Sequence, residues 1–234
     1  MRKRRDTNLR FQPASDQTLL VYFGDGISLL THRKIVRFLK LLSAEPISGV
    51  LNLQPAYTSL LIKFDPRATS HSGLEVSIGE LLLRVDDVTL PAPRTREIPV
   101  CYGGDFGPDL NEVAGLHNTS AEEVIHLHAS ANYTVYFLGF VPGFAYLGGL
   151  PDALATPRLG TPRKSVPAGS VAIGGNQTGV YPTSTPGGWR LIGKTPLKLF
   201  DPLLAHASFF ELGDEVRFVP ITSDEFGRLA AQSK

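Results

Sequence analysis

Residues 139–202 read GFVPGFAYLGGLPDALATPRLGTPRKSVPAGSVAIGGNQTGVYPTSTPGGWRLIGKTPLKLFDP. This stretch contains 12 glycines and 9 prolines in 64 residues, about half of all the Gly and Pro in the chain. Long helices are excluded here, because in a helix interior Gly costs ~1 kcal/mol and Pro ~3 kcal/mol. The helix breakers are interleaved with apolar side chains, which argues against low complexity: Phe140, Phe144, Tyr146, Val171, Ile173, Tyr181, Trp189, Leu191 and Ile192. The stretch therefore predicts turns and short strands in an ordered β domain.

The rest of the second half of the chain shows further short apolar runs between turns. Strands are predicted at 98–100, 133–138, 166, 170–173, 180–181, 189–192, 197–200 and 216–219. Pro108 can begin a short helix that reaches about residue 115, and Thr119 with Glu122 matches a capping box for a helix over 120–129. Several short strands at roughly ten-residue spacing favour a sandwich or a barrel.

The first part of the chain has a different pattern. Strands are predicted at 18–23, 49–54 and 58–64, and amphipathic helices over 28–43 and 72–85. This β-α-β-β-α order makes up most of a split βαβ unit. The segment Pro-Ala-Pro-Arg-Thr at 91–95 interrupts it. We therefore predict an α+β protein, with a small N-terminal α/β domain at 13–92 and a β domain at 93–234.

The net charge of +1 is unevenly distributed along the chain. Residues 1–10 carry +4, so the remaining residues sum to −3. We interpret residues 1–12 as a disordered basic tail, and a slightly acidic body argues against a nucleic-acid partner. No apolar run approaches the roughly 18 residues of a membrane span, and the basic head lacks the apolar region of a signal peptide. The lone Cys101 cannot form an internal disulfide, which fits a cytoplasmic protein.

Residues 188–195 literally satisfy G-x-x-x-x-G-K-[ST], the phosphate-binding P-loop pattern. A P-loop lies between a strand and a helix, so that backbone N–H groups and a helix N-terminus face the phosphates. Here Pro196 follows at once, and 197–200 alternates like a strand. The sequence around the match therefore argues against a P-loop.

His126 and His128 lie near the end of the helix predicted over 120–129. Two residues apart on a helix they point in nearly opposite directions, and H-E-x-x-H and Cys-pair motifs are missing, so no metal site is expected. Each histidine can be a favourable cation at a helix C-terminus, and His128 is also a candidate general acid or base. Cys101 has no base nearby in sequence, and Ser170 is not in a G-x-S-x-G elbow, so neither is predicted to be a nucleophile.

The tripeptide Thr-Pro-Arg occurs twice, ending at Arg158 and at Arg163. A fixed backbone before a planar, bidentate cation is suited to holding a carboxylate or a phosphate. A solvated loop is the alternative for each copy. Other side chains on turns of the same domain are compatible with a binding site, namely Gln177, Thr178 and Tyr181, whereas Trp189 is either core or pocket wall.

With these residues in place, the chain resembles the family of 5-oxoprolinase B subunits, also called allophanate hydrolase subunit one or the sporulation kinase A inhibitor family, which corresponds to carboxyltransferase subdomains C and D. The matching blocks are collinear and run from about Asp16 to Phe226. They are PAYTSLL at 55–61, IPVCYGGDFGPDL at 98–110, VYFLGFVPGFAYLGGL at 135–150, TPR at 161–163, VPAGSV at 166–171, QTGVYP at 177–182, PGGW at 186–189 and GDEVRF at 213–218. Ser165 and Lys194 are small departures from the family pattern.

The resemblance implies a small N-terminal α/β domain followed by a cyclophilin-like β-barrel. It also implies a tight complex with the C subunit of 5-oxoprolinase, completed by a further A subunit. The implied reaction is the ATP-dependent hydrolysis of 5-oxo-L-proline to L-glutamate. ATP is then a cofactor of the assembly, bound by this chain or by one of its partners.

The implied chemistry suggests roles for the candidate residues. Phosphorylation of the carbonyl oxygen would activate the lactam, and both the phosphate and the substrate carboxylate call for Arg or Lys side chains. The catalytic candidates are His128, Arg163 and Tyr181; the substrate-binding candidates are Arg158, Ser170, Gln177, Thr178, Trp189 and Lys194; the candidate pocket walls are Phe140, Gly143, Phe144 and Tyr146. Arg163→Ala is expected to abolish turnover of the assembled enzyme without unfolding it.

Two other functions are compatible with the same fold and motifs. One is a protein-binding inhibitor of a histidine kinase, with no chemistry of its own. The other is one component of a carboxyltransferase of the allophanate hydrolase or urea carboxylase type. Met1 is the only methionine, so a Met-Lys-Met biotin site is excluded and biotin would arrive on another chain.

Overall fold

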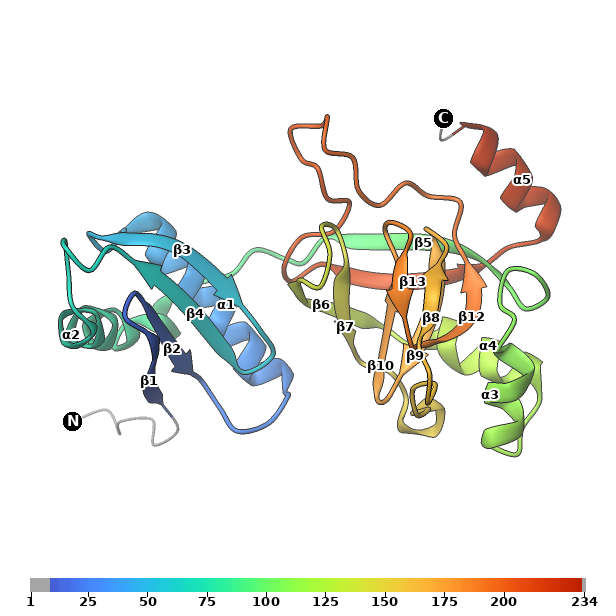
Figure 1. Ribbon diagram of the computed structural model, residues 1–234, viewed down its shortest axis with the longest axis horizontal. Coiled ribbons are helices and arrows are strands. Elements are labelled where there is room, and N and C mark those ends of the chain that lie inside the picture. Colours follow the sequence, from blue (N-terminus) through green and yellow to red (C-terminus); the bar gives the residue numbers. More distant parts are fainter. Residues whose placement is uncertain (1–8, 233–234) are drawn as a thin grey trace. The chain divides into compact units, whose positions relative to one another are not determined.

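The computed structural model describes residues 9–232, and the chain forms two compact units that divide between Ala92 and Pro93 (Figure 1). This division falls within the Pro-containing segment 91–95. Among the described residues, no helix is long and apolar enough to cross a membrane.

The first unit is a four-stranded antiparallel sheet with two helices. The strands are β1 (Arg10–Ser15), β2 (Thr18–Tyr22), β3 (Val50–Pro55) and β4 (Ser59–Phe64), in the order β1-β2-β4-β3, and the helices are α1 (Leu29–Ala44) and α2 (His71–Leu82). Because β4 is antiparallel to both β2 and β3, these two strands are parallel to each other, with α1 between them in the chain. The predicted split βαβ unit is therefore confirmed.

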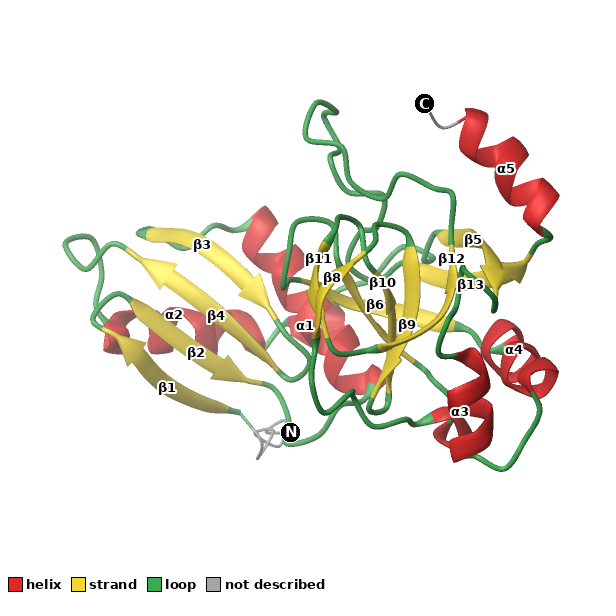
Figure 2. Cartoon of the chain, turned by 45° about the vertical axis from the view of Figure 1, so that its right-hand side comes forward, coloured by secondary structure: helices red, strands yellow, loops and turns green. Residues whose placement is uncertain are grey.

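Side-chain alternation and helix caps explain these elements. In β4, Leu60, Ile62 and Phe64 share one face and are fully buried, as residues two apart in a strand do when that face covers a core. Ser28 precedes α1 and Ser70 precedes α2, and each Oγ accepts a hydrogen bond from the N–H three residues later, at 3.1 and 3.2 Å. Both helices cover the same face of the sheet (Figure 2).

The expected disordered tail at 1–12 extends too far along the chain. Residues 1–8 lie outside the described residues, but β1 begins at Arg10 and pairs with β2, with Phe11 opposite Val21. Phe11 is partly buried against the core of this unit. The strand forms because the sheet offers free backbone partners and an apolar surface, neither of which the positive charge of the head reveals.

The second unit is built on a closed seven-stranded barrel. Around the barrel the strands are β10 (Gln177–Val180), β7 (Ala145–Gly148), β6 (Tyr133–Leu138), β13 (Glu215–Pro220), β5 (Thr95–Tyr102), β12 (Arg190–Lys194) and β9 (Ser170–Gly174). Neighbours are antiparallel except for β5 and β13, which are parallel. The unit also contains the pair β8 (Arg163–Val166) and β11 (Thr185–Gly187), and the helices α3 (Leu110–Leu116), α4 (Ala121–Ser130) and α5 (Ser223–Gln232).

Four elements of this unit differ from the prediction. The strand expected at 197–200 does not form, and only an isolated bridge joins Phe200 to Ser208. Pro196 and Pro202 flank the segment, and a proline has no N–H to donate to a ladder. Strands β7 and β11 were not predicted, because both are short and contain glycine. Helix α5 was not predicted either, although Phe226, Leu229 and Ala230 recur at helical spacing; none of its residues is fully buried, and Phe226 packs against Phe106.

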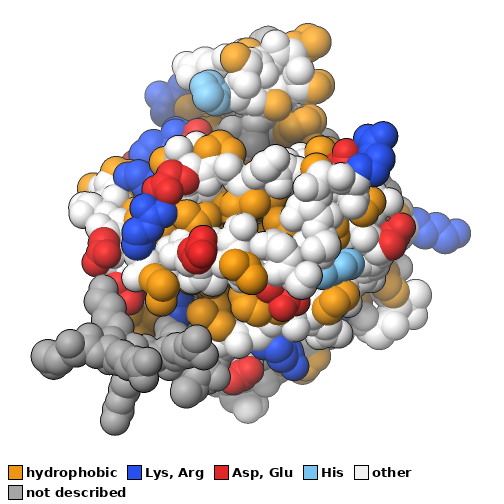
Figure 3. Space-filling model, turned by 90° about the vertical axis from the view of Figure 1, so that its left-hand side faces the viewer, with side chains coloured by type: hydrophobic (Ala, Val, Ile, Leu, Met, Phe, Trp, Pro, Cys, Tyr) orange, Lys and Arg blue, Asp and Glu red, His pale blue; other side chains and the backbone are white. Residues whose placement is uncertain are grey.

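The face of the molecule drawn in Figure 3 carries a mixture of charges. Lys and Arg side chains are interspersed there with Asp, Glu and apolar groups. The described residues of this face therefore form no continuous field of one sign, such as the basic surface with which proteins neutralise nucleic-acid phosphates.

Candidate functional site

A cavity of about 240 Å³ opens on the second unit, and we call it the aromatic pocket. Its lining residues all come from positions 140–189: Phe140, Phe144, Tyr146, Arg158, Pro162, Tyr181, Pro186, Gly187, Gly188 and Trp189. Six of them are predicted site residues, namely Phe140, Phe144, Tyr146, Arg158, Tyr181 and Trp189. The turns of the Gly- and Pro-rich stretch thus place these six side chains around one cavity.

The walls of the aromatic pocket are rings packed edge to face around Phe144. Its ring centroid lies 5.0 Å from that of Tyr146, 5.5 Å from that of Tyr181 and 5.7 Å from that of Trp189, at interplanar angles of 66 to 78°. Phe144, Tyr181 and Trp189 are buried and belong to a small cluster separate from the main barrel core. Edge-to-face packing is favourable because the positive ring edge meets the negative ring face, so the pocket has a stable apolar wall.

Two glycines are needed for this packing. A Cβ at Gly174 would lie 2.4 Å from Cδ1 of Trp189, and a Cβ at Gly187 would lie 2.4 Å from the hydroxyl oxygen of Tyr181. Any larger residue at either position would displace an aromatic wall. Part of the glycine excess therefore serves close approach of side chains to the backbone.

Phe140 is held at the pocket in a rare backbone conformation. Its φ is +67°, and the N–H of Val141 donates a hydrogen bond to the carbonyl of Gly139 at 2.8 Å, which closes a γ-turn around it. Nearby Gly143 has φ +81° and does not line the pocket; a Cβ there would lie 2.7 Å from Cβ of Phe200. A bulky residue at positive φ is strained, and such strain is concentrated at ligand sites.

Arg158 supplies a positive charge at the aromatic pocket. Its guanidinium carbon lies 5.7 Å from the ring centroid of Trp189, within cation–π range, and its side chain is exposed. Within residues 9–232, no carboxylate forms an ion pair with Arg158. Its N–H donors are therefore available to an anion in the pocket.

Tyr181 adds a neutral hydrogen-bond donor. Burial raises the pKa of Tyr181, while a hydrogen bond from the backbone N–H of Trp189 and the charge of Arg158 act in the opposite direction. The phenol therefore stays protonated at neutral pH. Because its oxygen accepts from Trp189, its O–H can donate to a carbonyl or carboxylate oxygen of a ligand.

Arg163 has a different position from the one expected of a ligand clamp. Its Nη2 donates to Oδ1 of Asp109 at 2.6 Å, and its Nη1 donates to the carbonyl of Trp189 at 3.4 Å. Asp109 is only 6% exposed, and its Oδ2 accepts the N–H of Leu191 at 2.6 Å. Arg163 does not line the aromatic pocket and acts as the counter-ion of a buried carboxylate.

His128 lies inside the barrel and is fully buried. The hydroxyl of Thr178 donates to the carbonyl of Ala172 at 3.0 Å, so it accepts from Nε2 of His128 at 2.9 Å, and Nδ1 then accepts the O–H of Tyr102 at 2.8 Å. Burial lowers the pKa of His128 to about 3, and burial raises the pKa of Tyr102. This network keeps a neutral histidine with both nitrogens satisfied, which is a structural arrangement, away from the pocket that Tyr181 and Arg158 line.

The remaining substrate-binding candidates lie on barrel strands and do not line the aromatic pocket. Buried Ser170 begins β9, Gln177 begins β10, and Lys194 ends β12. Strand β12 occupies most of the P-loop match, and residues 195–214 form no helix, so a phosphate loop is not built there. Across the described part of the chain, no group of three or more His, Cys, Asp or Glu side chains is placed to hold a metal.

Sequence reasoning missed the partner of Arg163. Asp109 follows Pro108 and directly precedes α3, so its position resembles an ordinary helix start, where acidic residues are common. Asp109 is recognised as the buried counter-ion of Arg163 only in the tertiary structure, where β8 and β12 approach the start of α3. Pro162, Pro186 and Gly188 were also missed as wall residues, because turn residues reveal nothing about the cavity that they border.

Comparison with known proteins agrees with this architecture. The chain is 40% identical over 227 residues to the 5-oxoprolinase B subunit of Bacillus subtilis, covering 93% of this chain and 95% of that protein. It is 42% identical over 212 residues to the 5-oxoprolinase B subunit of Haemophilus influenzae, covering 88% and 95%.

Among solved structures, TTHA0988 is 37% identical with a TM-score of 0.78, over 89% of this chain and 40% of the other. Urea carboxylase of Kluyveromyces lactis is 18% identical with a TM-score of 0.77, over 100% and 24%, a likeness of fold. This chain thus spans less than half the length of both solved chains. Residues 9–210 match the carboxyltransferase domain, subdomain C and D. The chain therefore belongs to the carboxyltransferase subdomain C and D family, together with the 5-oxoprolinase B subunits.

Proposed function

We propose that this chain is the B subunit of a multi-subunit 5-oxoprolinase. With the A and C subunits it would hydrolyse 5-oxo-L-proline to L-glutamate at the expense of ATP, in the cytoplasm. Family membership supports the reaction class, and the aromatic pocket with Arg158 at its wall is the observation that carries the proposal to this chain.

The chemistry of the substrate suits the aromatic pocket. 5-oxo-L-proline has an apolar ring edge, a lactam and one carboxylate. The rings of Phe144 and Trp189 would contact the methylene groups, Arg158 would pair with the carboxylate, and the O–H of Tyr181 would donate to the lactam oxygen. A donor placed on that oxygen favours addition of water to the carbonyl carbon, because negative charge develops on the oxygen in that step and is lost when the tetrahedral intermediate collapses with cleavage of the ring C–N bond.

ATP would supply the phosphoryl group that activates the lactam. The residues of the P-loop match do not fit a nucleoside triphosphate, because β12 occupies most of the match and no helix follows. We therefore place ATP on another member of the assembly.

Biotin-dependent carboxyl transfer is a second candidate function that the fold of urea carboxylase favours, with the biotin carried by another chain.

Co-expression with the A and C subunits, followed by measurement of glutamate released from 5-oxo-L-proline with and without ATP, tests the proposal. ATP-dependent release that requires this chain is the expected result. Biotin-dependent carboxylation of urea by the assembly, or tight binding to a histidine-kinase dimerisation domain without glutamate release, would replace it with one of the alternative functions.

A further inference from the structure

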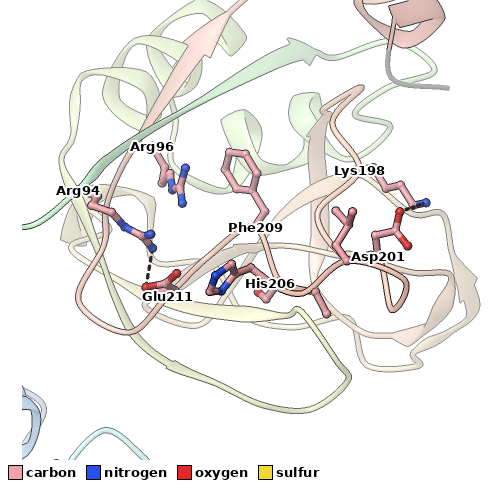
Figure 4. Close-up of a pocket in the computed structure, with 10 residues that line it drawn as sticks. Arg94, Arg96, Lys198, Asp201, His206, Phe209 and Glu211 are labelled. Carbon is pink, nitrogen blue, oxygen red and sulfur yellow. Dashed lines mark hydrogen bonds and ion pairs between the residues drawn. The ribbon is translucent and has the colours of Figure 1, made fainter. Parts of the chain in front are cut away.

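A second cavity, of about 370 Å³, lies on the barrel unit and shares no lining residue with the aromatic pocket. It is bordered by the start of β5 and by the segment that connects β12 with β13: Arg94, Arg96, Lys198, Asp201, Leu204, His206, Ala207, Ser208, Phe209 and Glu211. In Figure 4, Arg94 and Arg96 occupy one side of this cavity and the Lys198–Asp201 pair the other. We call it the arginine cavity.

Arg94 and Arg96 share one buried counter-ion. Asp214 is 3% exposed and accepts two hydrogen bonds from Arg94, at 3.0 and 3.1 Å, and one from Nε of Arg96 at 3.5 Å. The N–H of Glu211 also donates to Asp214, at 2.8 Å. This carboxylate is thus fixed in place, and it balances the charge of only one guanidinium.

The second balancing charge is exposed and displaceable. Glu211 pairs with Nη2 of Arg94 at 2.9 Å, but its side chain is 53% exposed. An exposed ion pair contributes only about 0–1 kcal/mol, so an incoming anion can replace it at small cost. The carboxylate of Glu211 therefore stands where an external anion would bind.

Arg96 presents the free donors. Its guanidinium carbon lies 4.9 Å from the ring centroid of Phe209, which fixes its orientation, and among residues 9–232 it pairs with no carboxylate besides Asp214. Only Nε is directed to Asp214, so the outer nitrogens remain for a ligand in the cavity. The third cation, Lys198, is held by Asp201 at 2.7 Å.

We propose that the arginine cavity binds a small anionic group, a carboxylate or a phosphate, on Arg96 and Arg94, with displacement of Glu211. A planar guanidinium is suited to bidentate recognition of either group. The site is independent of the proposed function, because it uses none of the residues of the aromatic pocket.

The test is an NMR titration of the full chain with inorganic phosphate and, separately, with acetate, followed at the backbone amides of 94–96 and 206–211. Saturable shifts are expected with at least one probe, and the tighter probe identifies the ligand class. Arg96→Gln should weaken binding about tenfold or more, since it removes charge-assisted hydrogen bonds. Glu211→Gln should tighten it about two- to fivefold by removing the competitor.

The matched control is Arg217→Gln, which removes an exposed arginine bound to Asn132 outside the cavity and should leave the affinity unchanged. The gain of affinity in Glu211→Gln cannot result from misfolding. No saturable shift with either probe, or equal affinities in wild type, Arg96→Gln and Glu211→Gln, would overturn the proposal.

Discussion

Thr156-Pro157-Arg158 and Thr161-Pro162-Arg163 have the same sequence and different environments. Arg163 is bonded at 2.6 Å to a buried carboxylate, whereas Arg158 is exposed beside Trp189 at the wall of a cavity. Both arginines follow a proline with a fixed φ, so the local backbone preference is the same. What differs is the tertiary partner, an aspartate at the start of α3 in one copy and an aromatic ring in the other.

This difference separates two tasks. A cation that neutralises a buried carboxylate inside the protein has its donors occupied and contributes to stability. A cation that faces an apolar cavity without a counter-ion contributes little to stability and can recognise a ligand. The expectation that Arg163→Ala would spare the fold is therefore replaced by the opposite expectation.

The largest effect is expected for Arg163→Gln. It leaves the carboxylate of Asp109 buried without its counter-ion, so the free energy of unfolding of the second unit should fall by about 3 kcal/mol. Urea denaturation followed by the fluorescence of Trp189, the only tryptophan, measures it. Arg158→Gln should change the same quantity by no more than about 0.5 kcal/mol. Equal losses of unfolding free energy in Arg163→Gln and Arg158→Gln would contradict the difference between the two arginines.

A smaller effect, on activity instead of stability, is expected for Arg158→Gln. Loss of a charge-assisted contact should lower kcat/KM for 5-oxo-L-proline in the assembled enzyme about ten- to a hundredfold. Lys164→Gln is the matched control, because it removes an exposed cation of the same segment that does not line the pocket. If both variants keep wild-type kcat/KM, Arg158 is a solvated loop residue.

Gly187→Ala tests the wall that faces Arg158. The new Cβ would overlap the hydroxyl of buried Tyr181, and overpacking of this kind costs about 1–3 kcal/mol. Gly160→Ala is the control, since a Cβ at Gly160 meets no atom within 4 Å. Thermal unfolding and substrate affinity should change only in the first variant, and an unaffected Gly187→Ala protein would show that the wall is not close-packed.

The effect that is smallest at neutral pH concerns His128, because the contribution of this buried imidazole changes only below pH 6.5. Its pKa is about 3 in the folded barrel and 6.5 in the unfolded chain, so the unfolded state binds more protons between these values. Stability is fully present above pH 6.5 and is lost as the pH falls towards 3, by up to about 1.4 kcal/mol per pH unit. Denaturation followed at Trp189 at several pH values should show this slope in wild type and a shallower one in His128→Asn. An unchanged slope in the variant would contradict burial of a neutral histidine.

Much of the fold was predictable from local signals. Short segments of sequence contain these signals: the period-two alternation at 58–64, the serine caps before both helices of the first unit, and the proline-rich interruption at 91–95. The short strands β7 and β11 were not predictable, because they are ordered by pairing with other strands of the unit.

The sequence identified several of the residues that make up the candidate site, but it predicted only part of how they are arranged in space. The aromatic side chains and Arg158 line one cavity, since they lie on turns of one glycine-rich stretch, whereas Gly143 of the same stretch does not line it. His128 and Thr178 were also candidates, but α4 and β10 place their side chains together in the core of the second unit, where Nε2 of His128 and the hydroxyl of Thr178 form a hydrogen bond.

The sequence by itself determined the two-unit organisation, the family and the set of residues from which a site can be made, because periodicity, turn chemistry and motif blocks are local properties. Only the tertiary structure decided which of two identical tripeptides faces a cavity and which neutralises Asp109. That choice depends on the burial and charge of residues some fifty positions away, which no local pattern contains.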